Sequence, residues 1–173
     1  MLPDMLFGRL NHGSCCTEGF CFVFGDGKAK GVLKSTEAIR TLEVLDLKLL
    51  RQNLEDEQIS SMLQNISWQS VELQCLAKYD CIVPFTISTK EILILGGITG
   101  TNKTDICRFD VASSELSTRS ESVGVKIEVS QKDFCSGGEV GLNQVVFRAR
   151  DSSSGSKCNF LYSIDSNTLE KLP

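Results

Sequence analysis

Short apolar runs that stop at polar turns recur along this chain. In the clearest example, Glu91–Val111, the large apolar residues Ile92–Leu95 end at Gly96-Gly97 before a polar turn. Four consecutive apolar residues, in place of alternating apolar and polar ones, predict a strand buried on both faces. The pattern therefore favours a fold of short strands joined by turns.

Weaker copies of this pattern lie on either side. The run Phe20–Phe24 stops at Gly25, and a third run begins at Gln144. In each copy an aspartate follows an apolar residue near the end of the next predicted strand, at Asp46, Asp110 and Asp165. Their spacings of 64 and 55 residues are typical of repeated β-propeller blades once an insertion is allowed in the first copy. The copies define three units within a single domain, at about 7–73, 74–122 and 123–173.

Several segments modify this repeat. The apolar residues of Leu54–Ile66 follow helical spacing, which predicts a short helical insertion near 54–66 in the first unit. Pro84 demotes the run around it from a central strand or marks a bulge. Alternation over Val123–Val129 predicts a half-buried strand, and Gly137 and Gly138 are interpreted as turn residues.

The motifs resemble those of the kelch-repeat family. Arg9 and His12 stand in an Arg-x-x-His-Gly start, and the apolar run of the second unit ends in the pair Gly96-Gly97, for which Gly25 stands in the first unit. The aromatic–Asp pair Phe109-Asp110 follows a polar loop, as it does in that family. The resemblance covers most of the chain and implies an all-β, partial kelch-type β-propeller of about three four-stranded antiparallel blades.

The same resemblance implies roles for these residues. The glycines would allow tight strand exits, and the aspartates would accept hydrogen bonds from turn amides. His12 would make a structural hydrogen bond. Another β-propeller, or a β domain of a different kind, remains an alternative for the fold.

Three blades do not close a ring, because propellers have about four to eight. Each repeat needs neighbours to cover its faces, so two terminal faces would remain exposed. Three explanations compete: the chain is a fragment, its ends are capped, or two chains associate into a six-blade ring. A fragment or a half-ring is favoured, and we expect the isolated chain to self-associate.

Composition and charge indicate which classes of partner and which cellular compartment to expect. The 173 residues carry a net charge of −4, and the 18 basic residues are scattered without a run, so nucleic acid is not an expected partner. No apolar run approaches the ~18–20 residues that span a bilayer, so no membrane contact is expected. Asp4 stands where a secretory signal would have its basic region, which favours a cytoplasmic protein.

The cysteines and the lone histidine predict neither metal nor cofactor. Eight cysteines occur without a Cys-x-x-Cys pair, and a single histidine leaves no set with zinc spacing. Several cysteines lie among strand-type apolar residues, where Cys behaves as a small hydrophobe. We expect reduced thiols and no resident metal or cofactor.

Tests for an enzyme fail on the same residues. A catalytic triad would have to use His12, and neither GxGxxG nor GxxxxGK[ST] occurs. The copper-radical oxidases related to kelch proteins need several His and Tyr ligands, against one His and two Tyr here. We therefore predict a non-catalytic protein–protein interaction module of the kelch type, an adaptor or scaffold. The alternatives are a fragment of a propeller enzyme or carbohydrate-binding protein whose active-site blades are missing, and a product without present function.

Three polar loops at corresponding places in the units are candidate sites for a protein partner. Loops of this kind carry binding residues on a scaffold of strands, although each may equally be a solvated turn without a partner. The candidate contact residues are Lys28, Lys30 and Lys34 in the first loop, Thr99, Asn102 and Lys103 in the second, and Asp151 and Lys157 in the third.

Overall fold

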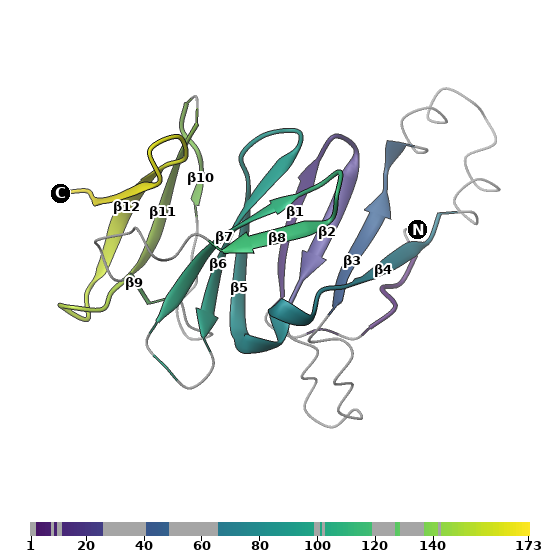
Figure 1. Cartoon of the computed structure of the whole chain (residues 1–173), viewed down its shortest axis with the longest axis horizontal. Helices are drawn as coiled ribbons and strands as arrows, with labels where there is room; N and C mark the ends of the chain where they lie inside the picture. Colours follow the sequence, from purple (N-terminus) through teal and green to yellow (C-terminus); the bar gives the residue numbers. More distant parts are fainter. Residues whose placement is uncertain are drawn as a thin grey trace.

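In the part of the chain that the structure describes, three antiparallel sheets follow one another, each built on four strands, with a fifth short strand added to the last sheet (Figure 1). The computed structural model describes residues 3–7, 9, 12–25, 41–48, 66–98, 101, 103–118, 127–128, 137–141 and 143–173. The four main strands of each sheet are neighbours in chain order. The all-β class and the four-stranded antiparallel units predicted from the sequence are confirmed.

The strands have the following bounds. The first sheet contains β1 (Gly13–Thr17), β2 (Phe20–Phe24), β3 (Thr41–Asp46) and β4 (Trp68–Glu72). After a 3₁₀ turn at Gln74–Lys78, the middle sheet contains β5 (Tyr79–Thr86), β6 (Glu91–Ile98), β7 (Thr104–Asp110) and β8 (Glu115–Thr118). The last sheet contains β10 (Gly137–Glu139), β11 (Gln144–Asp151), β12 (Lys157–Ser163) and β13 (Thr168–Lys171), with β9 (Ile127–Glu128) also paired to β11.

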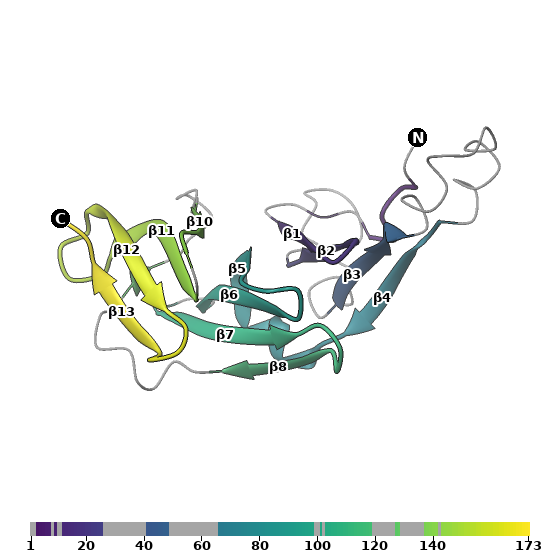
Figure 2. The same cartoon turned by 90° about the horizontal axis from the view of Figure 1, so that it is seen from above.

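The sheets pack face to face in a row, with the middle sheet between two apolar cores (Figure 2). Ile92 and Ile94 of β6 pack toward the first sheet, against residues such as Phe22. Leu93 and Leu95 pack toward the last sheet. All four are fully buried, which confirms the prediction of a strand buried on both faces.

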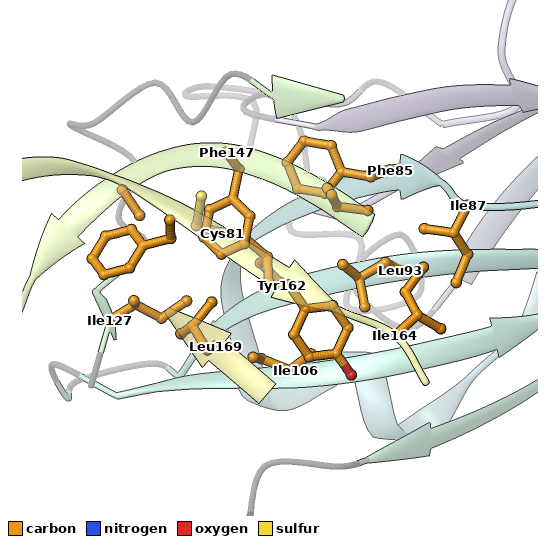
Figure 3. Packing of buried hydrophobic residues seen from close by; sticks show 14 residues of the cluster. Cys81, Phe85, Ile87, Leu93, Ile106, Ile127, Phe147, Tyr162, Ile164 and Leu169 are labelled. Carbon is orange, nitrogen blue, oxygen red and sulfur yellow. The ribbon is translucent and has the colours of Figure 1, made fainter. Parts of the chain in front are cut away.

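The core between the middle and last sheets combines aliphatic residues with four aromatic rings (Figure 3). The Phe147 ring lies between those of Phe85 and Phe160, with centroid distances of 5.9 Å to each. Tyr162 is fully buried beside them and donates its hydroxyl proton to Asn167 Oδ1 at 2.6 Å. Because this hydrogen bond satisfies the Tyr162 hydroxyl, the aromatic ring can be buried among apolar side chains.

The two outer faces of the row differ. On the first sheet, Val23 and Leu45 alternate with the residues that face the middle sheet, yet both are buried. The N-terminal segment lies over this face, because Leu6 N donates to Glu43 Oε2 at 2.6 Å and Trp68 Nε1 donates to Pro3 O at 3.0 Å. One terminal face is therefore capped by the chain itself.

The outward face of the last sheet is mixed in polarity. Val146 and Arg148 of β11 pair with Leu161 and Asn159 of β12, and these positions alternate with the buried ones. Arg148 and Asn159 are exposed, while Val146 and Leu161 are partly buried. A polar outer face is what a terminal repeat needs in water.

The structure corrects one detail of the sequence interpretation, agrees with another, and describes two predicted segments only in part. Gly137 and Gly138 lie in β10 instead of a turn, and a Cβ on Gly137 would meet Val146 O at 2.4 Å. Pro84 lies in β5, an edge strand of the middle sheet, as predicted. The predicted strand Val123–Val129 is described only at its residues 127–128, which form β9. The predicted insertion near 54–66 lies outside the described residues except for Ile66.

Candidate functional site: the loop ends of the three sheets

The second and third strands of every sheet are joined at the same end, called here the loop end. The connections run from β2 to β3, from β6 to β7 and from β11 to β12, and they contain the three candidate loops. Lys28, Lys30, Lys34, Thr99 and Asn102 lie outside the described residues. Lys103, Asp151 and Lys157 are described, so the third loop can be examined in full and the second at Thr101 and from Lys103 onward.

A buried ion pair lies at the loop end of the first sheet. Arg9 Nε is 2.7 Å from Glu43 Oε1, and neither side chain exposes any surface. Arg9 NH1 also donates to Gly25 O at 2.5 Å and to Thr41 O at 3.1 Å, and NH2 donates to Thr41 Oγ1 at 2.9 Å. Arg9 thus ties the N-terminal segment to the ends of β2 and β3.

Tyr79 occupies the corresponding place between the first and middle sheets. Its hydroxyl lies 2.9 Å from Asp105 Oδ2 and 3.1 Å from Cys107 Sγ, and Lys78 Nζ donates to the same Asp105 oxygen at 2.6 Å. Burial, followed by hydrogen bonding with Cys107 and Asp105, raises the pKa of Tyr79 above its usual range. The Tyr79 hydroxyl therefore stays protonated and donates a hydrogen bond to Asp105.

Gly96 has a specific reason to lack a side chain. A Cβ at this position would lie 2.6 Å from Cδ1 and Cε1 of the Tyr79 ring. The glycine pair predicted as a strand exit thus lies within β6, and Gly96 provides the space into which Tyr79 packs. Gly25, which holds the matching place in the first sheet, has a φ of +92°, a conformation that favours glycine.

The loop between β11 and β12 is closed by Asp151. Its Oδ1 accepts hydrogen bonds from Ser153 N at 2.9 Å and Ser153 Oγ at 2.6 Å, and its Oδ2 accepts from Ser154 Oγ at 3.0 Å and Lys171 Nζ at 2.8 Å. The Lys171 hydrogen bond, followed by those from Ser153, holds the pKa of Asp151 well below its usual range. Asp151 is only 5% exposed, so it shapes the loop from within. The residues that face solvent are those at 153–157, including Lys157.

The described loop ends of the middle and last sheets present cations. Lys103 and Lys157 are exposed, and the side chains of Lys78 and Lys171 expose 43% and 44% of their surface beside their aspartates. Lys103 sits on a turn in which Ile98 N donates to Lys103 O at 2.9 Å and Thr101 Oγ1 donates to Ile98 O at 3.0 Å. Asp105 and Asp151 balance the charges of Lys78 and Lys171, so the positive charge at these loop ends comes from Lys103 and Lys157.

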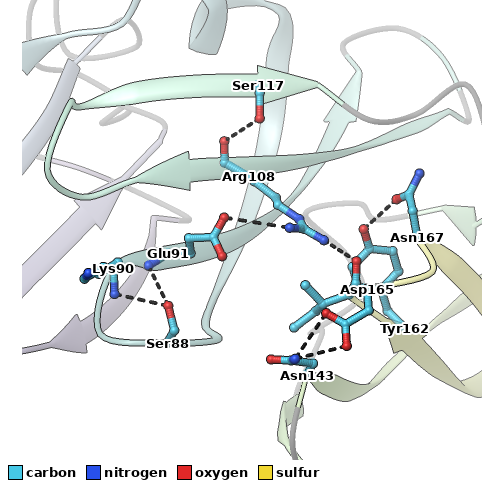
Figure 4. Close-up of polar contacts among 10 residues, drawn as sticks. Ser88, Lys90, Glu91, Arg108, Ser117, Asn143, Tyr162, Asp165 and Asn167 are labelled. Atoms are coloured by element: carbon cyan, nitrogen blue, oxygen red, sulfur yellow. Dashed lines mark hydrogen bonds and ion pairs between the residues drawn. The ribbon is translucent and has the colours of Figure 1, made fainter.

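At the opposite end, the repeated aspartates accept hydrogen bonds in two ways. Asp46 Oδ1 accepts from Lys48 N at 2.8 Å and Asp110 Oδ1 from Ser113 N at 2.7 Å, as the resemblance implied. Asp165 instead accepts from the side-chain nitrogen of Asn143 at 3.0 and 3.1 Å (Figure 4). In the strand register the position of Asp46 and Asp110 belongs to Ser163, so Asp165 lies two residues beyond the true repeat position.

Arg108 bridges the middle and last sheets near Asp165 (Figure 4). Its NH2 group donates to Ile164 O, and its NH1 lies 3.7 Å from Glu91 Oε1. Its Nε is buried and has no hydrogen-bond partner within the described part of the chain. No sequence pattern predicts this contact, because it joins residues 56 positions apart.

Two further motif residues, Phe109 and His12, lie in different surroundings. Phe109 is fully buried and packs edge-on against Phe24 at 5.7 Å and Phe22 at 6.0 Å. His12 is exposed just before β1, and the structural hydrogen bond expected for it stays a prediction. Its position just before β1 leaves the imidazole in solvent.

Across the described ranges, no three His, Cys, Asp or Glu side chains are placed to share a metal ion. No helix in the described part of the chain has the length and apolar character to cross a bilayer. No protein-family model and no curated protein matches the sequence.

Proposed function

We propose that this chain is a non-catalytic protein-interaction module that contacts its partner through the loop ends of the middle and last sheets. The proposal rests on the loop between β11 and β12. Its backbone is fixed by Asp151, while the residues at 153–157 are exposed.

Preorganisation is what makes this loop suited to binding. Asp151 N donates to Ser156 O at 2.9 Å, Gly155 N donates to Asp151 O at 2.8 Å, and Arg150 NH1 donates to Gly155 O at 2.7 Å. A loop already held in one conformation loses less entropy when a partner binds than a flexible loop does. Its exposed surface can therefore contribute to affinity without first being ordered.

The exposed charges indicate the chemistry of the partner surface. Lys103 and Lys157 lie at the loop ends of neighbouring sheets, with Lys78 and Lys171 partly exposed beside them. An acidic protein surface complements such an arrangement, and complementary charge raises the rate of association and selects among partners. The proposed partner is thus a protein with an acidic contact patch.

Charge reversal at the loop ends tests the proposal. The wild-type chain and the variants Lys103→Glu, Lys157→Glu and Lys90→Glu would each be immobilised, and the proteins retained from the same cell extract would be compared quantitatively. Lys90 is exposed in the β5–β6 turn at the opposite end of the middle sheet, so Lys90→Glu has the same change in net charge and serves as the matched control.

We expect a protein that the wild type and Lys90→Glu retain equally and that both loop-end variants bind at least about tenfold more weakly. Its retention should also fall as salt is raised, because exposed charges are screened. Equal retention by all four chains, or loss with Lys90→Glu alone, would contradict the proposal.

A further inference from the structure

The β1–β2 hairpin places two cysteines directly opposite each other. Its turn is Glu18-Gly19, with φ of +48° and +82°, and the strand register pairs Thr17 with Phe20 and Cys16 with Cys21. Positive φ at both central residues is the type I′ turn that joins tightly paired strands.

The register also fixes the kind of pair that the cysteines form. A β-turn is closed by a hydrogen bond between its first and last residues, so Thr17 and Phe20 form a hydrogen-bonded pair. Because such pairs alternate along an antiparallel ladder, Cys16 and Cys21 form the next, non-hydrogen-bonded pair. Cα atoms in such a pair are about 4.5 Å apart, within the range that a disulfide spans.

The thiols of Cys16 and Cys21 differ from that of Cys15 in the face of the hairpin on which they lie. Cys16 is exposed and Cys21 is half-buried on the same face of the hairpin, whereas Cys15 faces the other way and packs toward the middle sheet. Burial raises the pKa of Cys15 to about 12. Burial, followed by hydrogen bonding with Cys16, raises the pKa of Cys21 to about 12. Cys16 is therefore the thiol best placed to react first with a reagent in solution.

The backbone around the pair is held in place. Thr86 Oγ1 donates to Cys16 O at 2.9 Å, and Thr17 Oγ1 donates to Ser88 O at 3.0 Å. These contacts fasten β1 to β5 of the middle sheet. The register therefore keeps the two Cα atoms opposite each other while the sulfurs react.

We propose that Cys16 and Cys21 are a redox modification site that closes to an intramolecular disulfide on reaction with an oxidised small-molecule disulfide such as glutathione disulfide. The Cys16 thiolate attacks one glutathione sulfur, the glutathione S–S bond breaks, and one glutathione leaves as its thiolate. The Cys21 sulfur, on losing its proton, then attacks Cys16 Sγ and displaces the second glutathione. Two protein thiols and one glutathione disulfide thus give one protein disulfide and two glutathione thiols.

The test uses the full chain equilibrated in glutathione buffers of graded potential. Thiols are trapped with N-ethylmaleimide, and the tryptic peptide covering residues 10–28, which contains all three cysteines, is measured by mass spectrometry. We expect one internal disulfide, seen as a loss of about 2 Da, with one thiol alkylated. The bond should form with an equilibrium constant at least about tenfold larger in the folded chain than in denaturant, since the fold holds the sulfurs together.

Three single variants identify the pair. Cys16→Ser and Cys21→Ser should each abolish the internal disulfide, and Cys15→Ser, which removes the adjacent thiol, should leave it unchanged. Cys16 is exposed, so Cys16→Ser is not expected to impair folding, and circular dichroism checks this. Loss of the bond in Cys15→Ser, a disulfide to any other cysteine, or equal formation in the folded and denatured chain would overturn the proposal.

Discussion

Arg9 and Glu43 form an ion pair 2.7 Å across, in which neither side chain exposes any surface. The pair joins the N-terminal segment to β3, and Leu6 N donates to the second Glu43 oxygen. Removing one partner would leave an uncompensated charge in the interior, which costs more than the pair itself contributes.

We therefore expect Arg9→Ala to lower the free energy of unfolding by about 3–5 kcal/mol, measured by urea denaturation. Lys78→Ala is the matched control, because Lys78 also pairs with a carboxylate but its side chain is 43% exposed, so its loss should cost at most about 1 kcal/mol. The double variant Arg9→Met/Glu43→Leu should recover much of the loss. Equal effects of Arg9→Ala and Lys78→Ala would show that burial of the first pair is unimportant.

Gly96→Ala should destabilise the chain by about 1–3 kcal/mol, because its Cβ would press on the Tyr79 ring. Gly138→Ala provides the comparison: Gly138 also lies in a strand, but a Cβ there meets nothing within 4 Å, so the change should stay within about 0.5 kcal/mol. Thermal or urea denaturation measures both. The explanation fails if the two substitutions have the same effect.

Tyr79 should make stability fall at high pH. Its pKa is raised in the folded chain, so above about pH 10 the unfolded chain releases a proton that the folded chain retains. The unfolded state is then favoured as pH rises, by up to about 1.4 kcal/mol per pH unit from this residue. Denaturation between pH 8 and 11 should show a steeper loss in wild type than in Tyr79→Phe. Parallel curves would mean that Tyr79 ionises equally in both states.

Asp151→Ala should release the loop between β11 and β12. The substitution removes the acceptor for Ser153, Ser154 and Lys171, so we expect hydrogen exchange at the Ser153 amide to accelerate by at least about tenfold. Ser156→Ala, an exposed position in the same loop, serves as the control and should leave this rate unchanged. If Asp151→Ala exchanges as slowly as wild type, the carboxylate does not order the loop.

The capped face of the first sheet bears on association. Because residues of Pro3–Arg9 cover this face, light scattering coupled to size exclusion should give a mass near the 19.0 kDa of one chain. A chain lacking the first nine residues should associate, since Val23 and Leu45 would lose their cover. A mass of twice 19.0 kDa for the full chain would instead favour the pairing of two half-rings expected from the sequence.

The local pattern of apolar residues is sufficient to predict the strands that form the two cores. The run Ile92–Leu95 predicted burial on both faces because consecutive apolar side chains in a strand must point to opposite sides. Phe20–Phe24 and its stop at Gly25 were equally clear. The strand Glu115–Thr118, in contrast, lies in a polar stretch with little apolar signal, and only pairing with β7 defines it.

The contacts that join the sheets were beyond reach of the sequence. Arg9 was singled out for its motif, but nothing in the spacing identified Glu43, 34 residues away, as its partner. Residue type aligns Asp165 with Asp46 and Asp110, but the strand register places Ser163 at that position. The sequence pattern identifies Asp151 only as a polar loop residue. Its burial and its pairing with Lys171 arise because β13 folds against the same sheet.

The mixed outer face of the last sheet limits what could pack against it. A fourth sheet packed there as the last sheet packs on the middle one would bury Arg148 and Asn159, which are now exposed. Lineages that added a sheet at this end would first have to exchange those two side chains for apolar ones, as Leu95 and Ile106 are in the middle sheet. The two positions at which apolar side chains would be needed to pack another sheet here can thus be read from two neighbouring strands.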